Sequence, residues 1–393
     1  MKILQINSVC GVLSTGRICT DIAEILTEQG YECKIAYGRE TVPEKYGKYA
    51  VRIGNDFDIN IHALKSRIFD NSGFESRNVT EKFINWVKEY DPDIIHLHNI
   101  HGYYINIEGL FEYLKSCNKK IIWTLHDCWT FTGHCTYFDF IGCEKWENGC
   151  SNCPQKKEYP KSLIKDNSYL NYIRKKQIFT SVNNIVIITP SNWLAGLLKD
   201  SFLGKYEVKV INNGIDLTVF KPTESDFRKQ NGLIDKKIIL GVASVWDKRK
   251  GFNDFIKLSK MLDDNYKIVM VGLSKKQIKL LPENILGIPH TNSVSELAEI
   301  YSVADILVNP TYEDNYPTVN LEALACGTPV ITYVTGGSSE IVSIGLGAAI
   351  PKGDIEALFD KIKSINCAIE IPKFNLDKNI KYDEYIKLYM ENV

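Results

Sequence analysis

Residues 312–329 read YEDNYPTVNLEALACGTP, and local signals in this stretch predict a short helix of about ten residues. Asn315 can cap the helix, Pro317 suits its first turn, and a Gly-x-Pro sequence ends it. Apolar runs at 306–309 and 330–333 lie on either side and are typical of buried strands. The stretch therefore predicts a strand-helix-strand unit of an α/β fold.

Two carboxylates, Asp314 and Glu322, stand eight residues apart around the start of this helix. The unpaired N–H groups and the positive dipole end of a helix N-terminus favour phosphate. Glu322 can accept hydrogen bonds from ribose hydroxyls, while Asp314 faces the sugar that a diphosphate carries. An ordinary capped helix with acidic residues has the same spacing, so that alternative stays open. The turn that would seat the phosphate consists of Asn315, Tyr316, Pro317 and Thr318.

The segment resembles the acid-x7-acid signature of the retaining glycosyltransferases of family 4, in which two acids precede an Ala-rich helix and a Gly-Thr-Pro-Val strand entry. The resemblance implies a transferase that moves sugar from a nucleoside-diphosphate sugar to a saccharide or lipid-linked acceptor, in surface polysaccharide biosynthesis. The family usually has Glu as its first acid. Here Asp314 holds that place with Glu313 beside it, and both stay candidates for the catalytic carboxylate that faces the sugar.

The totals favour two domains and local binding patches. A chain of 393 residues exceeds the size of one ordinary core. With 47 basic and 48 acidic residues, nothing favours a nucleic-acid partner. The start MKILQINSV reads as a strand without a secretory signal, and no apolar run is long enough to cross a membrane. We expect a cytoplasmic protein, and peripheral contact with the inner face of the cell membrane stays open.

Short apolar runs alternate with helical stretches in both halves of the chain, which predicts buried parallel sheets. The expected strands are 3–6, 33–37, 94–98, 121–125, 185–189, 237–245, 267–272, 306–309 and 330–333. The main expected helices are 15–29, 107–116, 192–199, 252–261 and 294–301.

This alternation predicts two doubly wound, Rossmann-like α/β domains, and the family resemblance implies the GT-B arrangement in which they face a central cleft. The first domain spans 1–210 and is the acceptor side. The second spans 211–374 and binds the nucleotide sugar. The stretch 375–393 is a helix that in the family returns to the N-terminal domain.

Two further positions lie at strand ends of the first half. His126 follows the strand 121–125, and the resemblance implies that it contacts the sugar and acceptor. We expect it to position rather than deprotonate, because the leaving diphosphate can take the acceptor proton. Gly16, in the loop and helix entry after the first strand, is implied as a donor contact. A buried histidine and a plain helix entry are the structural alternatives.

Residues 244–252, SVWDKRKGF, bring cations to a strand end of the second half. Lys250 matches the lysine that the family places before a glycine, whereas the usual arginine position is displaced and Arg249 is its substitute. Cations and a helix N-terminus can neutralise a diphosphate. No metal or other cofactor is therefore expected for catalysis, and a solvated basic turn is the alternative reading.

The insertion 128–153 contains a dense group of thiols that ends in a C-x2-C pair. In a reducing compartment this density predicts a structural zinc, with free thiols or one disulfide as the alternatives. His96, His98 and His101 have no acidic partner nearby in sequence, so we expect no metal there. The predicted zinc ligands are Cys135, Cys143, Cys150 and Cys153.

Two other functions fit the same two-domain plan. A nonhydrolysing nucleotide-sugar epimerase would need carboxylates facing the sugar from both halves, and the sequence offers them only in the second. A catalytically inactive sugar-binding protein would keep the site without turnover. Release of an epimer without acceptor would identify the first, and binding without turnover the second.

Overall fold

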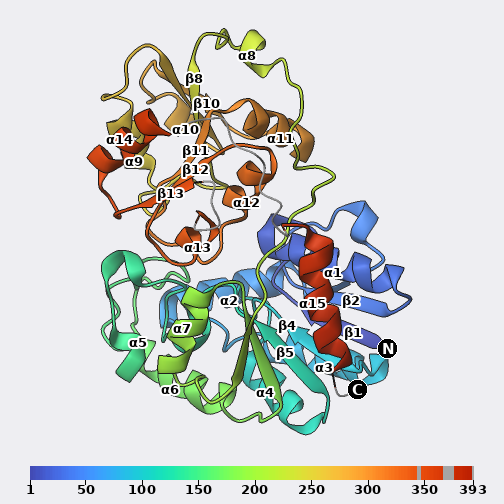
Figure 1. Ribbon diagram of the computed structural model, residues 1–393. Helices are drawn as coiled ribbons and strands as arrows, with labels where there is room; N and C mark the ends of the chain where they lie inside the picture. The colour runs from blue at the N-terminus through green and yellow to red at the C-terminus, as the bar shows by residue number, and fades with distance from the viewer. Residues whose placement is uncertain (343–346, 366–375, 392–393) are drawn as a thin grey trace. The chain divides into compact units, whose positions relative to one another are not determined.

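The structure, a computed structural model, describes residues 1–342, 347–365 and 376–391. Two compact units make up the chain (Figure 1): one comprises Met1–Asn212 with Tyr382–Val393, and the other comprises Asn213–Lys381. The polypeptide thus leaves the first unit after residue 212 and re-enters it at residue 382.

The first unit contains a seven-stranded sheet with the order β3-β2-β1-β4-β5-β6-β7. All its strand pairs are parallel. The order reverses between β1 and β4, and in open α/β sheets such a reversal leaves room for ligands at the carboxyl ends of the strands. The strands are β1 (Lys2–Ile6), β2 (Glu32–Tyr37), β3 (Ala50–Arg52), β4 (Ile94–Leu97), β5 (Lys120–Thr124), β6 (Ile185–Thr189) and β7 (Glu207–Val210).

Alternate residues of these strands feed two separate apolar cores. Ile3 and Ile94 belong to one core, and Leu4 and Ile95 belong to the other. Helices cover both faces, which is why the strands read as continuous apolar runs. The helices are α1 (Leu13–Glu28), α2 (Asp56–Phe69), α3 (Arg77–Tyr90), α4 (Ile107–Ser116), α5 (Lys145–Asn148), α6 (Ser168–Phe179), α7 (Asn192–Asp200) and α15 (Lys378–Met390), with short 3-10 turns η1 (Glu44–Tyr46), η2 (Trp129–Phe131) and η3 (Asp139–Ile141).

The second unit contains a six-stranded sheet with the order β10-β9-β8-β11-β12-β13, again parallel throughout. Its strands are β8 (Lys237–Val242), β9 (Tyr266–Val271), β10 (Ile285–Ile288), β11 (Ile306–Asn309), β12 (Val330–Tyr333) and β13 (Gly347–Ile350). Its helices are α8 (Phe227–Gln230), α9 (Phe252–Leu258), α10 (Lys275–Ile278), α11 (Val294–Val303), α12 (Thr318–Ala325), α13 (Ser338–Val342) and α14 (Ile355–Ser364).

The two segments at which the chain leaves and re-enters the first unit are hydrogen-bonded to each other. The N–H of Ile215 donates to the carbonyl oxygen of Leu376 at 2.8 Å, and the N–H of Lys378 donates back to Ile215 at 2.9 Å. The ammonium group of Lys378 lies 3.0 Å from Asp216. The stretch 212–235, which reads as a linker, is therefore anchored at its start to the segment that leads into α15.

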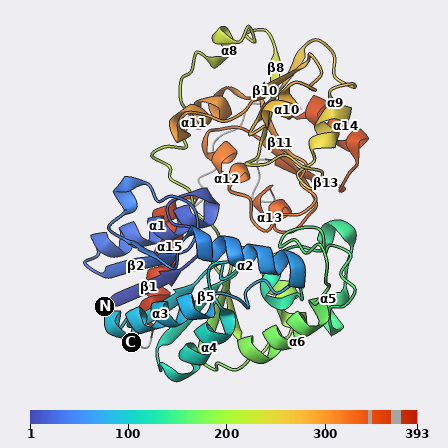
Figure 2. The ribbon, with the colours of Figure 1, turned by 180° about the vertical axis from the view of Figure 1, so that it is seen from behind.

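The α/β class and the two Rossmann-like sheets predicted from the sequence are confirmed. The strand Val330–Tyr333 has the predicted bounds, whereas β8 ends at Val242 rather than at residue 245. α15 begins at Lys378, so Leu376 and Asp377, which were predicted to be helical, precede the helix, and residue 375 lies outside the described residues. α2, in the foreground of Figure 2, was not predicted because it buries only His62 and Ser66 and shows no apolar stripe. Among the described residues, no helix combines the length and apolar character needed to span a membrane.

Candidate functional site

Two neighbouring strand ends of the second unit carry the predicted cations and acids. β8 and β11 pair directly, and the loops that follow them are joined where the N–H of Tyr312 donates to the carbonyl oxygen of Arg249 at 2.8 Å. Gly251 has a φ of 76°, and a Cβ atom there would lie 2.3 Å from the carbonyl oxygen of Pro310. Only glycine lets the two loops approach this closely.

The joined loops bring Lys250 against Asp314. The Lys250 ammonium nitrogen lies 2.5 Å from a carboxylate oxygen of Asp314, with side chains 23% and 17% exposed. The Lys250 N–H donates to the Asp247 carboxylate at 2.8 Å, which shapes the loop. Arg249 lies farther out, 3.9 Å from Asp247 and 36% exposed. A half-buried pair such as Lys250–Asp314 interacts more strongly than a fully solvated one.

The two adjacent acids have different surroundings. Glu313 is 2% exposed, and its carbonyl oxygen accepts a hydrogen bond from the Thr311 hydroxyl at 2.9 Å. Asp314 is the acid that forms the ion pair with Lys250. The structure thus joins one predicted acid to a predicted cation, while the orientation of either acid toward a sugar stays a prediction.

The start of α12 differs in detail from the prediction. The helix begins at Thr318 and has eight residues, with Pro317 rather than Asn315 as its N-cap and no capping side chain. Asn315 instead donates its N–H to the Asp314 carboxylate at 3.0 Å. Tyr316 is buried, and its carbonyl oxygen accepts a hydrogen bond from Asn213 at 3.2 Å. The first turn of α12 is therefore held by the loop before it rather than by a side-chain cap.

Glu322 lies in the second turn of α12 and is 5% exposed. The hydroxyl of Tyr301, from α11, donates to its carboxylate at 2.9 Å. A buried carboxylate needs such a donor to offset its lost hydration, and the bond also fixes the direction of the side chain. Sequence reasoning identified Glu322 but missed Tyr301, whose spacing within an amphipathic helix marks it only as core.

A buried polar network ties the strand ends of this unit to α12 and α13. Asn309 donates to Asn320 at 2.8 Å, and Asn320 donates to Ser338 at 3.1 Å. The Ser338 and Thr332 hydroxyls lie 2.7 Å apart, and Thr332 donates to the carbonyl oxygen of Asn309 at 2.9 Å. The closed circuit rigidifies the edge of the sheet on which the site stands. The sequence shows only scattered polar residues at these positions, so the network was not predicted.

Asp254 is a second unpredicted anchor. It is 3% exposed and accepts hydrogen bonds from the hydroxyls of Tyr312 at 2.7 Å and Tyr333 at 3.0 Å. Burial and the neighbouring Asp254 carboxylate raise the pKa of both tyrosines, so the two hydroxyls stay protonated and act as donors. Tyr312 is thereby fixed at the start of the loop that carries Asp314.

In the first unit, His126 is partly exposed and lies beside buried histidines at the ends of β4 and β5. Its Nε2 lies 3.1 Å from Nδ1 of His98, and the two rings stack at 12°. Nε2 of His98 lies 3.1 Å from the amide oxygen of Gln5. Burial lowers the pKa of His126 to about 4, with His101 adding to the effect and Asp127 opposing it. The neutral ring suits a positioning role better than a cationic one.

Beside these histidines, His101 and Asp127 form a contact that sequence reasoning missed. Nε2 of His101 lies 2.8 Å from the Asp127 carboxylate, whose other oxygen accepts the N–H of Trp129 at 2.9 Å. Burial alone would raise the pKa of Asp127, but His101 and the Trp129 N–H outweigh it and the pKa is lowered. The two partners are 26 residues apart in the sequence, and only the adjacency of β4 and β5 brings them together.

Gly16 is buried within α1, where the sequence predicted a donor contact. Its carbonyl oxygen accepts the N–H of Gly11 at 3.0 Å, and a Cβ atom at Gly16 would lie 3.0 Å from Val9. The residue therefore lets the loop after β1 fold back onto α1. Its contact with a ligand stays a prediction.

The four predicted zinc ligands, Cys135, Cys143, Cys150 and Cys153, line one cavity of about 20 Å³. Within the described ranges, no group of three or more His, Cys, Asp or Glu side chains is arranged to hold a metal ion. The four predicted ligands thus share a cavity, and their binding of a structural zinc stays a prediction.

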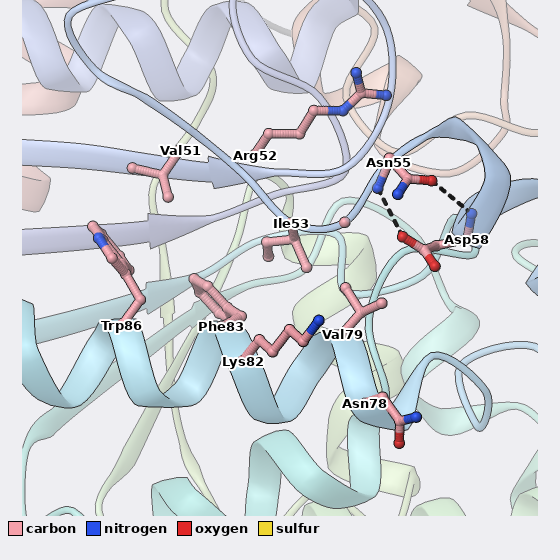
Figure 3. A pocket seen from close by; sticks show the side chains of 11 residues that line it. Val51, Arg52, Ile53, Asn55, Asp58, Asn78, Val79, Lys82, Phe83 and Trp86 are labelled. Atoms are coloured by element: carbon pink, nitrogen blue, oxygen red, sulfur yellow. Dashed lines mark hydrogen bonds between the residues drawn. The ribbon is translucent and has the colours of Figure 1, made fainter.

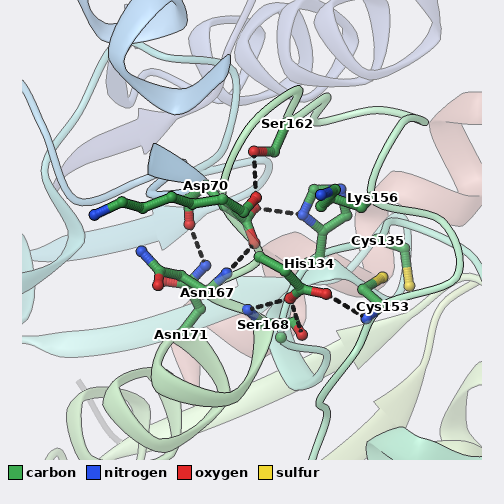
Figure 4. Close-up of polar contacts among 12 residues, drawn as sticks. Asp70, His134, Cys135, Cys153, Lys156, Ser162, Asn167, Ser168 and Asn171 are labelled. Atoms are coloured by element: carbon green, nitrogen blue, oxygen red, sulfur yellow. Dashed lines mark hydrogen bonds and ion pairs between the residues drawn. The ribbon is translucent and has the colours of Figure 1, made fainter. Parts of the chain in front are cut away.

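The thiols have other partners. The hydrogen bond between Cys135 and Cys153 lowers the pKa of Cys153 to about 7, although its burial acts in the opposite direction. Cys150 accepts the N–H of Gly133 at 3.1 Å. Nδ1 of His134, in the same insertion, lies 2.5 Å from a carboxylate oxygen of Asp70. This buried pair anchors the insertion (Figure 4).

A separate cavity of about 630 Å³ lies where β3 ends and α2 and α3 begin. Figure 3 shows Arg52 on one side and Lys82 and Trp86, from α3, on the other. The Asn55 side chain caps α2 and the Asp58 carboxylate accepts the Asn55 N–H in return, so this rim of the cavity is ordered. None of the residues predicted for the site lines this cavity.

Two parallel, Rossmann-like sheets, one in each unit, are the architecture of the GT-B class. A family profile described as Glycosyltransferase Family 4 matches residues 15–219, and a second, described as Glycosyl transferases group 1, matches residues 223–370. The first match covers more than half of the chain. The chain belongs to glycosyltransferase family 4.

Known proteins similar to the chain bear out this assignment. A putative colanic acid biosynthesis glycosyl transferase, WcaC of Escherichia coli K12, is 25% identical over 370 residues, which is 90% of this chain and 88% of WcaC. A Campylobacter jejuni enzyme, N,N'-diacetylbacillosaminyl-diphospho-undecaprenol alpha-1,3-N-acetylgalactosaminyltransferase, is 28% identical over 54% of this chain and 62% of its own length. The fold matches Anabaena HepE, solved with UDP, at a TM-score of 0.65 and 15% identity, over 99% of this chain and 95% of HepE.

Proposed function

We propose that this glycosyltransferase moves a sugar, with retention of anomeric configuration, from a nucleoside-diphosphate sugar to a saccharide or lipid-linked acceptor in surface polysaccharide assembly. The observation that carries the proposal is the Lys250–Asp314 pair beside the start of α12, with Glu322 held in the next turn. The names of the E. coli and C. jejuni relatives, which refer to colanic acid and to a lipid diphosphate, support the acceptor class.

Groups of the second unit would neutralise the negative charge of the donor's diphosphate. Lys250, Arg249 and the N–H groups of the first turn of α12 supply positive potential for a diphosphate. Glu322, fixed by Tyr301, would accept ribose hydroxyls. Asp314 or Glu313 would face the sugar, and His126 of the first unit would contact the sugar and acceptor. In such a site the diphosphate leaves with its charge already balanced, which lowers the barrier to bond breaking.

A thermal-shift panel of UDP-, GDP- and ADP-sugars tests the donor part. We expect one nucleotide to raise the melting temperature by several degrees, because a ligand that binds only the folded chain stabilises it. Glu322→Ala should abolish the shift, whereas Glu283→Ala, which removes an exposed carboxylate of the same unit, should keep it. A shift that survives Glu322→Ala would show that the donor binds elsewhere.

Product analysis tests the reaction. NMR of the isolated product should show the donor's anomeric configuration in the new linkage. An inverted linkage would refute retention. Free epimer formed without acceptor would identify an epimerase instead, and tight binding without turnover over a broad acceptor panel would identify a binding protein.

We also propose that transfer needs no metal ion, because Lys250, Arg249 and the start of α12 can neutralise the leaving diphosphate. Activity should survive dialysis against EDTA. Loss of transfer that magnesium restores would overturn this part of the proposal.

Peripheral contact with an anionic membrane is the last part of the proposal. Leu163, Ile164 and Leu170 are 56%, 66% and 55% exposed, an unusual grouping for a surface segment. The N–H of Leu163 donates to the carbonyl oxygen of Arg67 at 2.7 Å, so the segment lies against the end of α2, where Phe69 is 41% exposed. Apolar side chains interleaved with cations suit a lipid surface. The cations here are the exposed side chains of Arg67, Lys161 and Lys165.

Vesicle flotation tests this contact. The protein should float with vesicles that contain anionic phospholipid and less with purely zwitterionic ones. Ile164→Asp should reduce flotation, whereas Ile234→Asp, at an equally exposed isoleucine of the second unit, should not. Equal loss in both variants would refute the assigned surface.

A further inference from the structure

The insertion 128–153 places four thiols around one small cavity. Cys135 precedes the turn η3 and Cys143 follows it, while Cys150 and Cys153 come shortly after α5. All four are free thiols that line a cavity of about 20 Å³. A cavity needs roughly 10–15 Å³ to hold one water-sized sphere. This cavity is therefore large enough for a single ion and too small for an organic ligand.

Three of the thiols already have contacts that suit negatively charged sulfur. Figure 4 shows the side chains of Cys135 and Cys153 next to each other, and the two thiols are hydrogen-bonded. The sulfur of Cys150 accepts the N–H of Gly133 at 3.1 Å, and such a donor stabilises a thiolate. A Cβ atom at Gly133 would lie 2.7 Å from the Cβ atom of Cys150, so this close approach requires glycine.

The turn that carries Cys150 and Cys153 has a fixed backbone. Asn152, between them, has a φ of 47°, and the Lys145 ammonium group donates to its carbonyl oxygen at 3.1 Å. The N–H of Cys153 donates to the Asp166 carboxylate at 2.6 Å. Because these bonds order the turn, little conformational entropy is lost when its two sulfur atoms bind an ion.

A buried cation lies close to the thiols. Lys175, from α6, is 1% exposed, and its ammonium group donates to the carbonyl oxygens of Trp129 at 2.8 Å and Thr132 at 3.1 Å. Burial lowers the pKa of Lys175 to about 7, and negative charge at Cys150 and Cys135 acts in the opposite direction. A buried cation needs negative charge nearby, and thiolates at the cavity would supply it.

We propose that Cys135, Cys143, Cys150 and Cys153 bind one zinc ion as thiolates and that this ion is structural. Four thiol protons leave to solvent and four Zn–S bonds form, which gives an anionic centre. Zinc favours four such ligands in the closed, tetrahedral sites that stabilise folds. Lys175 would balance part of the negative charge. The proposal does not depend on sugar transfer, because these thiols are not among the residues proposed to contact donor or acceptor.

Binding requires the thiol side chains to rotate. Among the described residues, no group of three or more candidate ligands is yet arranged around a metal position. One rotatable bond separates each sulfur from the backbone, so the sulfur atoms can turn toward one ion while the fixed turn stays in place. The Zn–S bonds replace the hydrogen bond between Cys135 and Cys153, and metal binding is thereby coupled to loss of protons.

The metal content and ligand shell of the full-length protein test the proposal directly. Untagged protein, purified without chelator, should contain about one zinc per chain by mass spectrometry of the metal. X-ray absorption at the zinc edge should show four sulfur atoms at about 2.3 Å. Reduced protein that neither contains zinc nor takes it up would overturn the proposal, and so would a shell of nitrogen or oxygen atoms. The wild-type chain decides this question even if variants fold poorly.

A matched pair of variants tests the ligand assignment. Cys143→Ser removes one ligand, and we expect the zinc affinity, measured by competition with a chelator, to fall by more than about a hundredfold. Cys117→Ser removes a partly buried thiol at the end of α4 in the same unit and should leave the affinity unchanged. Equal affinity of the wild type and Cys143→Ser would overturn the assigned shell.

Two further measurements separate zinc from a disulfide and from a catalytic metal. A disulfide between Cys135 and Cys153 would lower the intact mass by two hydrogens, and that result would overturn the proposal. Removal of zinc should lower the melting temperature by several degrees, and zinc rather than magnesium should restore it. A melting temperature that does not change after zinc is removed would refute the structural role.

Discussion

The ammonium nitrogen of Lys250 lies 2.5 Å from a carboxylate oxygen of Asp314, although 64 residues separate them in the sequence. The pair exists because the loops after β8 and β11 are joined by the Tyr312–Arg249 main-chain bond. In the absence of donor, Asp314 holds the lysine at the strand ends. Under the proposed function, an incoming diphosphate would share that cation, which would couple binding of the donor to the orientation of the acid.

Lys250→Met should lower kcat about a hundredfold, because one charged donor to the leaving group is lost. Asp314→Asn should also lower kcat, and the double variant should lose less than the product of the two single losses, because each single change leaves a partner without its counter-charge. Lys248→Met, at an exposed lysine of the same loop, is the control. Strictly multiplicative losses in steady-state kinetics would show that the pair does not act as a unit.

Tyr301→Phe should weaken donor binding about fivefold with little change in kcat. The hydroxyl that holds Glu322 is lost, while the ring and the helix packing stay. The dissociation constant of the donor, measured by calorimetry, checks this. Tyr266→Phe removes a hydroxyl from the same unit and should leave the constant unchanged. A drop in kcat without a change in affinity would assign Tyr301 to the chemical step instead.

Folding stability should fall as the pH drops from 6.5 toward 4. Burial, the largest cause in each case, lowers the pKa of His62 and His96 to about 3 and of His126 to about 4, and lowers that of His98 well below 6.5. In this window the unfolded chain binds protons that the folded chain does not, and each histidine contributes up to about 1.4 kcal/mol per pH unit.

His134 acts with the opposite sign, because its hydrogen bond and ion pair with Asp70 overcome burial and raise its pKa. Its contribution to stability is fully present below its unfolded pKa of about 6.5 and is lost as the pH rises through its raised folded pKa, so it does not change the slope between pH 6.5 and 4. Urea denaturation at pH 7.5, 6.5 and 5.5 measures the net slope. His62→Gln should reduce this slope by the contribution of one histidine. A free energy of unfolding that does not depend on pH over this range would contradict the argument.

Asp70→Asn should destabilise the first unit by about 3 kcal/mol, because it leaves buried His134 without its counter-charge. Asp70 has a φ of 52°, a conformation that asparagine adopts equally well, so the change isolates the charge. Asp56→Asn, at an acid whose side chain is 82% exposed, should change stability by less than about 0.5 kcal/mol. Equal effects in urea denaturation would assign the cost to something other than the buried pair.

The sequence predicted the parts of the fold that periodicity controls. Strands buried on both faces, such as Ile185–Thr189, and a helix with a clear apolar stripe, Ile107–Ser116, lie where the patterns placed them. α2 was not predicted because its inward face carries His62 and Ser66. β3 was not predicted because it has only three residues. The prediction of Asn315 as the helix N-cap was wrong. Its N–H donates to the Asp314 carboxylate, and the helix begins only at Thr318.

The site was predictable one residue at a time, but its pairings were not. Motif spacing identifies Lys250, Asp314 and Glu322, yet it gives no indication that the first two touch or that Tyr301 holds the third. The His101–Asp127 contact depends on the adjacency of β4 and β5. Such contacts join residues that are far apart in sequence. Hydrophobic periodicity predicts where the strands are but not which strands lie side by side, so it could not predict these contacts.

α15 contributes Tyr382, Tyr385, Ile386, Leu388 and Tyr389 to one of the two cores of the first unit. That core is therefore completed only after the whole second unit has been synthesised. Until then, residues 1–212 lack the side chains of α15 that pack into this core. A fragment cut after residue 212 would need α15 supplied in trans or grafted onto its end to become compact.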